Sequence, residues 1–226
     1  TYIALLITSP YLIYLIIYAI NDLFNNGNMA LIASVIPGII PIFDILIVIL
    51  FSSVINSSAS TLISNEKYMI RICKIIPVSY YKQVIAKLLV PFILGTLSLL
   101  ITVITLVSTS LISFTNGLIS FTLALFLVLS NLIFGVYKDL KKPNFIDNSN
   151  SNNLASGVLY CLIVPLIILL IDLIIILIFY GFKIDATNLF TICIVIDVVI
   201  VFILFISSLI NIKRKVDRYF NLIEVN

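Results

Sequence analysis

The chain has 226 residues, of which 62% are hydrophobic and only 10% are charged, and its mean hydropathy is +1.27. Soluble domains carry about 25% charged residues, so this composition excludes a soluble domain and predicts an integral membrane protein. The formal net charge is only +3, and the basic residues are spread between apolar runs. That pattern argues against a nucleic-acid partner, which requires a concentrated basic face.

Several kinds of chemistry are disfavoured by residues that the chain lacks. It contains no histidine, which excludes Ser–His and Cys–His pairs and most zinc sites. It contains no GxxxxGK phosphate loop, so it is not itself a P-loop ATPase. The three cysteines have no paired spacing and are interpreted as small apolar packing residues: Cys73, Cys161 and Cys193. We therefore expect no catalytic residue, no metal site and no cofactor bound by this chain.

Six stretches of the chain are predicted to span the bilayer, because a spanning helix needs about 20 mostly apolar residues. They are residues 1–20, 29–55, 88–107, 117–136, 154–180 and 189–210. The predicted fold is therefore an all-α polytopic membrane protein that forms a single six-helix domain. The chain begins at Thr1, without a methionine and already inside an apolar run, so we expect a piece of a longer protein or a trimmed one.

The second stretch carries a signal for a broken or bending helix. Pro37 and Pro41 lie one turn apart, with Gly38 between them. Proline removes a backbone hydrogen bond and tends to kink a helix. Prolines are frequent in membrane helices, so the cluster has two interpretations: an ordinary kink, or a functionally mobile element.

The distribution of basic residues predicts the orientation. Loops 21–28 and 108–116 contain no Lys or Arg, and loop 180–188 contains only Lys183. The other twelve of the thirteen basic residues lie in three segments: the central stretch 56–87, the loop 137–153 and the tail 211–226. The positive-inside rule places these segments in the cytoplasm. We therefore predict that both termini are cytoplasmic.

Three acidic residues interrupt the apolar runs: Asp44, Asp172 and Asp197. A charged Asp at the centre of a spanning helix costs about 2.5–3.5 kcal/mol on insertion scales. No Lys or Arg lies in the same runs, so these acids must be protonated, hydrogen-bonded or next to a wet cavity. They form either a cation or proton site, or neutral hydrogen bonds between helices, with Asn131 as a further polar partner.

The central stretch is predicted to contain an amphipathic helix over residues 57–76, lying along the inner membrane surface. At 100° per residue, Lys67, Arg71 and Lys74 form a basic stripe on one flank, and Pro77 ends the helix. The apolar face is formed by Ala59, Leu62, Ile63, Met69, Ile70 and Cys73.

Glu66 is the exception in this pattern, because it points from the middle of the apolar face. A carboxylate in such a place requires a partner. The partner comes from another helix or from a docking protein. Alternatively, the segment is a plain interfacial helix whose Glu66 reaches sideways to a lysine.

These residues resemble the cytoplasmic segment of bacterial ABC-2-type transporter permeases. In that family a glutamate near the start of an inner amphipathic helix precedes a basic residue, an apolar pair and Pro-Val-Ser. The corresponding residues here are Glu66, Lys74, Ile75-Ile76 and Pro77-Val78-Ser79, followed by Lys87 before the next span. The match departs from the family just after the glutamate, where members usually carry a glycine and an aromatic pair and this chain has Lys67, Ile70 and Arg71. This difference bears on how a partner would dock, and not on the class of protein.

Two further patches fit the same family, so the resemblance covers the chain from about Asn56 to its end. One is Gly135, Asp139-Leu140 and Pro143 after the fourth span, and the other is the basic and aromatic tail 215–220. The resemblance implies six helices per permease half and an inner segment that couples to an ATPase. By this resemblance the coupling residues are Glu66, Lys67, Ile70, Arg71, Lys74 and Pro77.

The resemblance implies an exporter subunit that is not an enzyme. A separate ATP-binding-cassette ATPase would bind ATP and Mg²⁺, and a second permease half or a second copy of the chain would complete the path through the bilayer. Two alternatives remain open at this point. One is an ion-coupled secondary transporter that uses Asp44, Asp172 and Asp197, although no internal repeat is visible. The other is a non-transporting membrane factor, such as an immunity or assembly protein.

Overall fold

The computed structural model describes residues 2–26, 29–36, 38–143, 150–182 and 188–222, with some side chains inside these ranges left out. No strand occurs in these ranges, which are helical throughout apart from short turns. The long helices are α1 (Tyr2–Asn25), α3 (Ile39–Ile55), α5 (Tyr80–Ser108), α6 (Phe114–Lys141), α7 (Asn150–Gly181) and α8 (Leu189–Leu222). The short ones are α2 (Ala30–Val35), η1 (Asn56–Thr61), η2 (Ser64–Met69) and α4 (Ile70–Ile75).

Within the described residues, five helical segments are long and apolar enough to cross a membrane. They are Ile39–Thr61, Tyr80–Ser108, Phe114–Lys141, Gly157–Gly181 and Leu189–Leu222. This confirms the prediction of an all-helical protein of membrane character. Many of the large apolar side chains on these helices are exposed, as expected for surfaces that face lipid rather than water.

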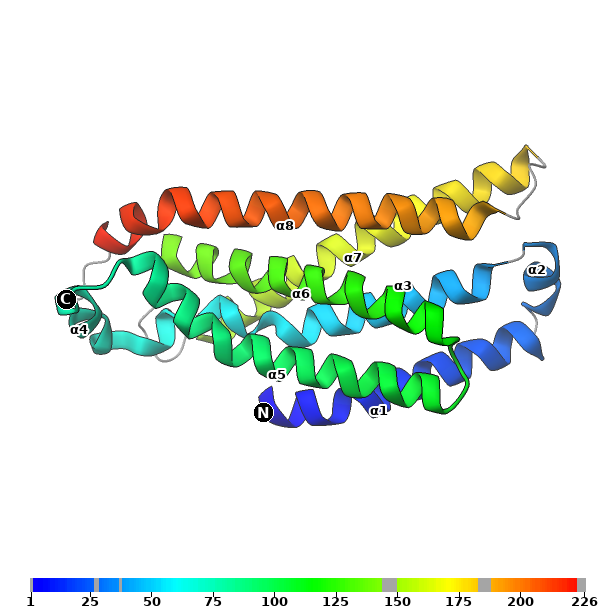
Figure 1. Ribbon diagram of the computed structural model, residues 1–226, viewed down its shortest axis with the longest axis horizontal. Helices are drawn as coiled ribbons and strands as arrows, with labels where there is room; N and C mark the ends of the chain where they lie inside the picture. The colour runs from blue at the N-terminus through cyan, green and yellow to red at the C-terminus, as the bar shows by residue number, and fades with distance from the viewer. Residues whose placement is uncertain (1, 27–28, 37, 144–149, 183–187, 223–226) are drawn as a thin grey trace.

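The long helices form an elongated bundle, in which α6 lies among α3, α5, α7 and α8 (Figure 1). Helix α1 packs along α3 and α5 on the side away from α8. The buried apolar residues form two clusters. One fills most of the bundle, and the other joins η1, η2 and α4 to the start of α5 and the ends of α6 and α8.

The second predicted stretch is broken. Helix α2 ends at Val35 and α3 begins at Ile39, so the expected single span over 29–55 is two helices. Gly38 has φ +91°, and a Cβ added there would lie 3.2 Å from the Cβ of Phe190 in α8. Both the left-handed backbone and the close approach favour glycine at this position. Pro37, part of the predicted signal, lies outside the described residues.

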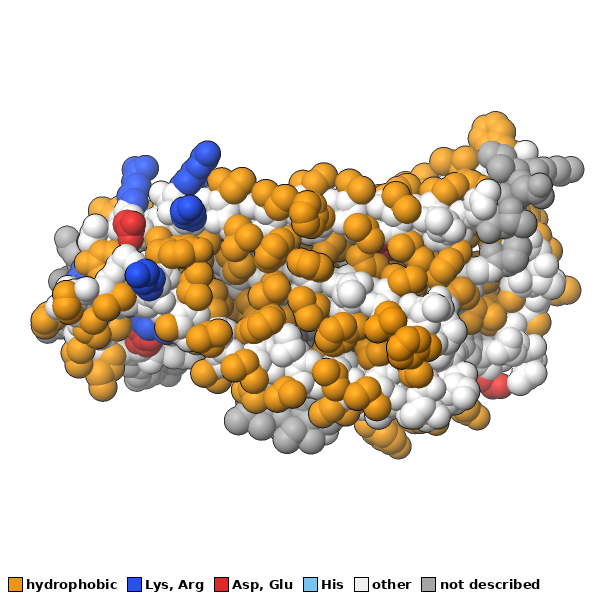
Figure 2. Space-filling model, viewed as in Figure 1, with side chains coloured by type: hydrophobic (Ala, Val, Ile, Leu, Met, Phe, Trp, Pro, Cys, Tyr) orange, Lys and Arg blue, Asp and Glu red, His pale blue; other side chains and the backbone are white. Residues whose placement is uncertain are grey.

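The described Lys and Arg residues gather at one end of the bundle, which we call the basic end. It is formed by α4, the start of α5 and the ends of α6 and α8. Figure 2 shows basic side chains at this end and mainly hydrophobic side chains along the middle of the same face. Lys183 lies outside the described residues.

The prediction of one continuous helix over 57–76 is wrong. The structure places two 3₁₀ segments and one short α-helix there, with a turn at Leu62 and Ile63. The expected apolar face is divided accordingly: Ile63 and Ile70 are fully buried, whereas Met69 is 63% exposed. Serine and asparagine compete with helical hydrogen bonds through their own side chains, and the first half of this segment holds four serines and Asn65. The break also follows from a capping interaction supplied by another helix.

Candidate functional site

The capping group is the carboxylate of Asp139, near the end of α6. Its Oδ2 atom accepts hydrogen bonds from the backbone N–H groups of Ile63 at 2.7 Å and Ser64 at 3.0 Å. Its Oδ1 atom accepts a hydrogen bond from the Ser64 hydroxyl. The first amides of a helix have no partner within the helix. Asp139 therefore caps η2 from a different helix, in the way that an Asp at the N-cap does locally.

A second contact between α6 and the central stretch lies one turn away from Asp139. A Cβ added to Gly135 would lie 3.2 Å from the Ser60 backbone nitrogen and 3.3 Å from the Ala59 carbonyl carbon. The absence of a side chain thus allows the backbone of η1 to approach α6 closely. Ala59 and Ser60 are both buried in this contact.

Glu66 is paired with Lys87 at the start of α5. The Lys87 Nζ atom lies 2.5 Å from the Glu66 Oε2 atom, and the two side chains are 19% and 24% exposed respectively. The Cys73 sulfur lies 3.5 Å from the same Nζ atom. The partner of Glu66 is therefore Lys87, a residue from another helix of the same chain. The pair ties η2 to α5, just as Asp139 ties it to α6.

The tail of α8 completes this end of the molecule. The rings of Tyr80 and Phe220 stack with their centroids 4.3 Å apart and their planes 16° apart. The Lys87 Nζ atom also lies 5.9 Å from the centroid of Phe220, which is within the range of a cation–π contact. Farther along, Lys215 donates to the Tyr137 hydroxyl at 3.4 Å. Three patches that are far apart in sequence therefore meet at the basic end: the central stretch, the end of α6 and the tail.

An exposed apolar surface lies on the outer side of this assembly. We call it the α4 edge, and it consists of Met69, Ile72, Ile75, Ile76 and Val78. Ile75 is 80% exposed. Hydrophobic side chains are visible at the extreme tip of the basic end (Figure 2), where Figure 1 places α4. Contiguous exposed apolar surface commonly marks an interaction site with a protein or a membrane.

The other residues predicted for coupling take different positions. Ile70 is fully buried and packs inside the cluster at the basic end. Lys74 and Pro77 are exposed. The side chains of Lys67 and Arg71 are not described. Of the predicted basic stripe, the structure therefore describes only the side chain of Lys74.

The intramembrane acids divide into two groups. Asp44 in α3 is 3% exposed, and its hydrogen-bond partner is Asn21 of α1. Asp172 in α7 and Asp197 in α8 interact with each other and with Cys193. Asn131 in α6 is not one of the side chains that hydrogen-bond to these carboxyl groups or affect them electrostatically. The predicted set is therefore a carboxylate pair, a separate Asp–Asn pair and a separate amide.

The carboxylate pair is the more unusual of these groups. Asp172 and Asp197 are 1% and 3% exposed. Both oxygens of Asp172 and Oδ1 of Asp197 have no hydrogen-bond partner among the described residues. Buried polar atoms without partners are costly and call for an explanation, and a carboxyl group that takes up a proton loses the charge that makes its burial most costly. No group of three or more possible metal ligands occurs in the described part of the chain.

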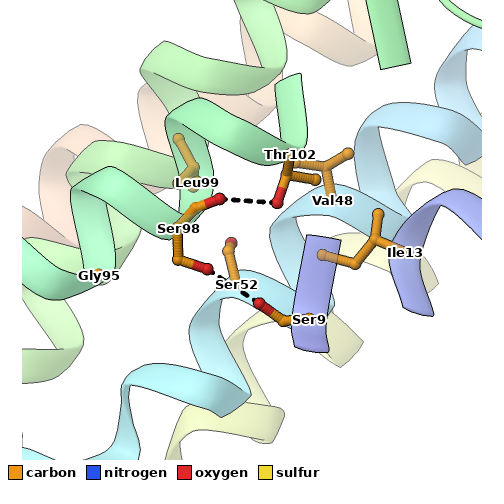
Figure 3. Close-up of a pocket in the computed structure, with 8 residues that line it drawn as sticks. All are labelled: Ser9, Ile13, Val48, Ser52, Gly95, Ser98, Leu99 and Thr102. Carbon is orange, nitrogen blue, oxygen red and sulfur yellow. Dashed lines mark hydrogen bonds between the residues drawn. The ribbon is translucent and has the colours of Figure 1, made fainter. Parts of the chain in front are cut away.

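A small polar cavity lies between α1, α3 and α5 (Figure 3). Ser9 of α1 and Ser98 of α5 are joined by a hydrogen bond of 2.9 Å between their hydroxyls, and Thr102 donates to the Ser98 carbonyl at 2.8 Å. The cavity has a volume of about 10 Å³, which is room for about one water molecule. It is too small for a substrate path, and the hydrogen bond between Ser9 and Ser98 joins α1 to α5 beside it. Its lining is Ser9, Ile13, Val48, Ser52, Gly95, Ser98, Leu99 and Thr102.

No family model matches this chain, and no match was found among curated proteins or solved structures.

Proposed function

We propose that this chain is the membrane-spanning subunit of an ABC-type exporter, driven by a separate ATPase. The observation that carries the proposal is the α4 edge, an exposed apolar surface on a segment that is fastened to two long helices by Asp139 and by the Glu66–Lys87 pair. An ATPase bound to this edge would act on the bundle directly. The meeting of the three patches that resemble ABC-2 permeases gives further support.

In this proposal the basic end is cytoplasmic, following the positive-inside rule. Helix α1 is the first of six spans, and both termini lie on the cytoplasmic side of the cell membrane. ATP and Mg²⁺ are bound by the partner ATPase. A second permease half or a second copy of this chain completes the translocation path. The central stretch then provides the inner coupling element, as a capped series of short helices.

The first test is association with an ATPase. The chain would be purified with the ATP-binding-cassette protein encoded in a neighbouring reading frame. The double variant Ile72→Asp, Ile75→Asp is expected to lower co-purification at least tenfold, because it places two charges on a surface that must lose water on docking. Both side chains are more than half exposed, so the fold itself is expected to survive. Full association by the double variant would contradict the proposal.

The matched control is Leu222→Asp, at the end of α8. Leu222 is 66% exposed and lies at the end of α8, and it is not one of the residues that form the α4 edge. This variant is expected to co-purify with the ATPase as the native chain does. Equal loss in the control would assign the effect to changed surface charge at this end and not to docking on the α4 edge.

A second candidate function is favoured by the Asp172–Asp197 pair. Two buried carboxyl groups that act on each other can take up and release a proton where they meet a wet cavity, as in proton-coupled secondary transporters. The purified chain would be reconstituted in vesicles with a pH-sensitive dye inside, under an imposed proton gradient and without ATP. This candidate predicts proton flux that is lost in the variant Asp172→Asn, Asp197→Asn and retained in Asp44→Asn. Absence of flux in the native chain would eliminate it.

A further inference from the structure

The central stretch is connected to the bundle both along the chain and through contacts in space. Along the chain it follows α3 and leads into α5. In space, η1 packs most extensively on α6, which is not its neighbour in sequence. A force on the α4 edge can therefore pass along the chain into α3 and α5, or across the packed contact into α6.

The contact with α6 is made directly to the backbone of the central stretch. The Asp139 carboxylate binds two consecutive backbone amides, of Ile63 and Ser64, and the Ser64 hydroxyl as well. Asp139 is 3% exposed, so its hydrogen bonds do not compete with water. One turn away, Gly135 brings the α6 backbone against the backbone of Ser60. Because α6 contacts the backbone of the central stretch directly, side-chain rotations cannot easily compensate for a displacement of one against the other.

Helix α6 is also the helix best placed to distribute a displacement. It packs against α3, α5, α7 and α8. Its buried residues belong to both apolar clusters, with Leu127 in the larger one and Leu132 in the one at the basic end. A shift of α6 therefore reaches the interior of the bundle along its whole length.

We propose that Asp139 is a positioning residue that fastens η2 to α6. Motion of the α4 edge then reaches α6 directly, as well as α3 and α5, to which the central stretch is joined along the chain. The fastening itself is a property of this chain. The delivery of motion rests on the proposed function. The two parts are therefore tested by separate measurements.

The fastening is tested by hydrogen exchange of the full chain in nanodiscs. Asp139→Ala is expected to speed exchange of the amides of residues 62–66 at least tenfold, because the Ile63 and Ser64 amides lose their acceptor. At short exchange times, before global unfolding contributes, exchange within residues 123–133 of α6 is expected to stay unchanged. Ser64→Ala removes the hydrogen bond from the Ser64 hydroxyl to Asp139 but leaves both backbone amides with their acceptor, so it is expected to give a smaller increase. Gly135→Val perturbs the same contact without changing charge and is expected to speed exchange of the same amides.

The control for these variants is Asp217→Ala, which removes an exposed acid at the same end of the molecule. It is expected to leave exchange of residues 62–66 as in the native chain. Native exchange rates in Asp139→Ala, or in both Ser64→Ala and Gly135→Val should Asp139→Ala fail to fold, would overturn the fastening.

The delivery of motion is tested with spin labels at the exposed positions Leu118 of α6 and Val195 of α8. The labels require a chain whose three cysteines are replaced, and the complex with the ATPase. Addition of ATP is expected to change the distance between the labels, and Ser64→Ala is expected to reduce that change by at least half while ATP hydrolysis continues. An unchanged response in Ser64→Ala and Gly135→Val would overturn the delivery. If the native chain binds no ATPase, the proposed function fails and hydrogen exchange still decides the fastening.

Discussion

Replacing Asp139 by alanine is expected to lower the free energy of unfolding by about 3–5 kcal/mol, because each buried backbone amide left without an acceptor costs about 1–3 kcal/mol. The substitution removes the acceptor of three hydrogen bonds. It also leaves the amides of Ile63 and Ser64 buried without a partner. Because η2 begins at these amides, the central stretch is expected to unfold before the rest of the bundle.

The chain supplies its own probe for this measurement. Cys161 and Cys193 are free and only 5% and 1% exposed, so a thiol-reactive dye reacts with them when the bundle opens. In detergent, with Cys73 replaced by alanine throughout, Asp139→Ala is expected to lower the unfolding midpoint by roughly 10 °C. Asp217→Ala serves as the matched control and is expected to shift it by less than about 2 °C. A shift of similar size in both variants would show that the capping bonds contribute nothing specific.

Reversing one charge of the Glu66–Lys87 pair is expected to cost about 2 kcal/mol, the typical strength of a hydrogen bond between charged groups. Glu66→Lys places two ammonium groups where the structure has an N–O distance of 2.5 Å. Lys87→Glu places two carboxylates there. The double variant Glu66→Lys, Lys87→Glu restores opposite charges and is expected to recover at least half of the loss.

The same three variants separate two roles for Glu66. Thermal unfolding with the thiol dye reports on the pair within the chain, and co-purification reports on the ATPase. If the double variant recovers both stability and ATPase association, Glu66 acts by holding η2 against α5. If it recovers stability alone, Glu66 or Lys87 also contacts the partner. A double variant less stable than either single variant would contradict the pairing itself.

The membrane class and the approximate positions of the long helices could be predicted from composition and run length. Segments longer than 20 apolar residues have few other stable structures in a bilayer, because every backbone group must be paired internally. The expected break near Gly38 also follows from local chemistry. The break within the central stretch was not predicted, since helical periodicity there is compatible with one continuous helix. Its cause lies in Asp139, which is 75 residues from Ser64 along the chain.

The candidate site, too, could be predicted from the sequence only in part. A partner for Glu66 was required by desolvation alone, but its identity as Lys87 depends on how the start of α5 packs beside η2. Gly135 and Asp139 were noticed only as part of a resemblance, and the structure shows that both touch the backbone of the central stretch. The intramembrane acids were recognisable one by one. Their division into Asp172 with Asp197 and Asp44 with Asn21 depends on helix packing.

The sequence by itself determined that this protein is helical and embedded in a membrane, and that its central stretch carries a carboxylate in need of a partner. These properties follow from local hydropathy and from the cost of burying charge, which each segment carries wherever it lies. Only the tertiary structure decided that the central stretch is divided at Ile63 and fastened to α6 through Asp139. Such pairings depend on which helices are neighbours in space, and helix neighbours in a uniformly apolar bundle are selected by packing and a few polar contacts.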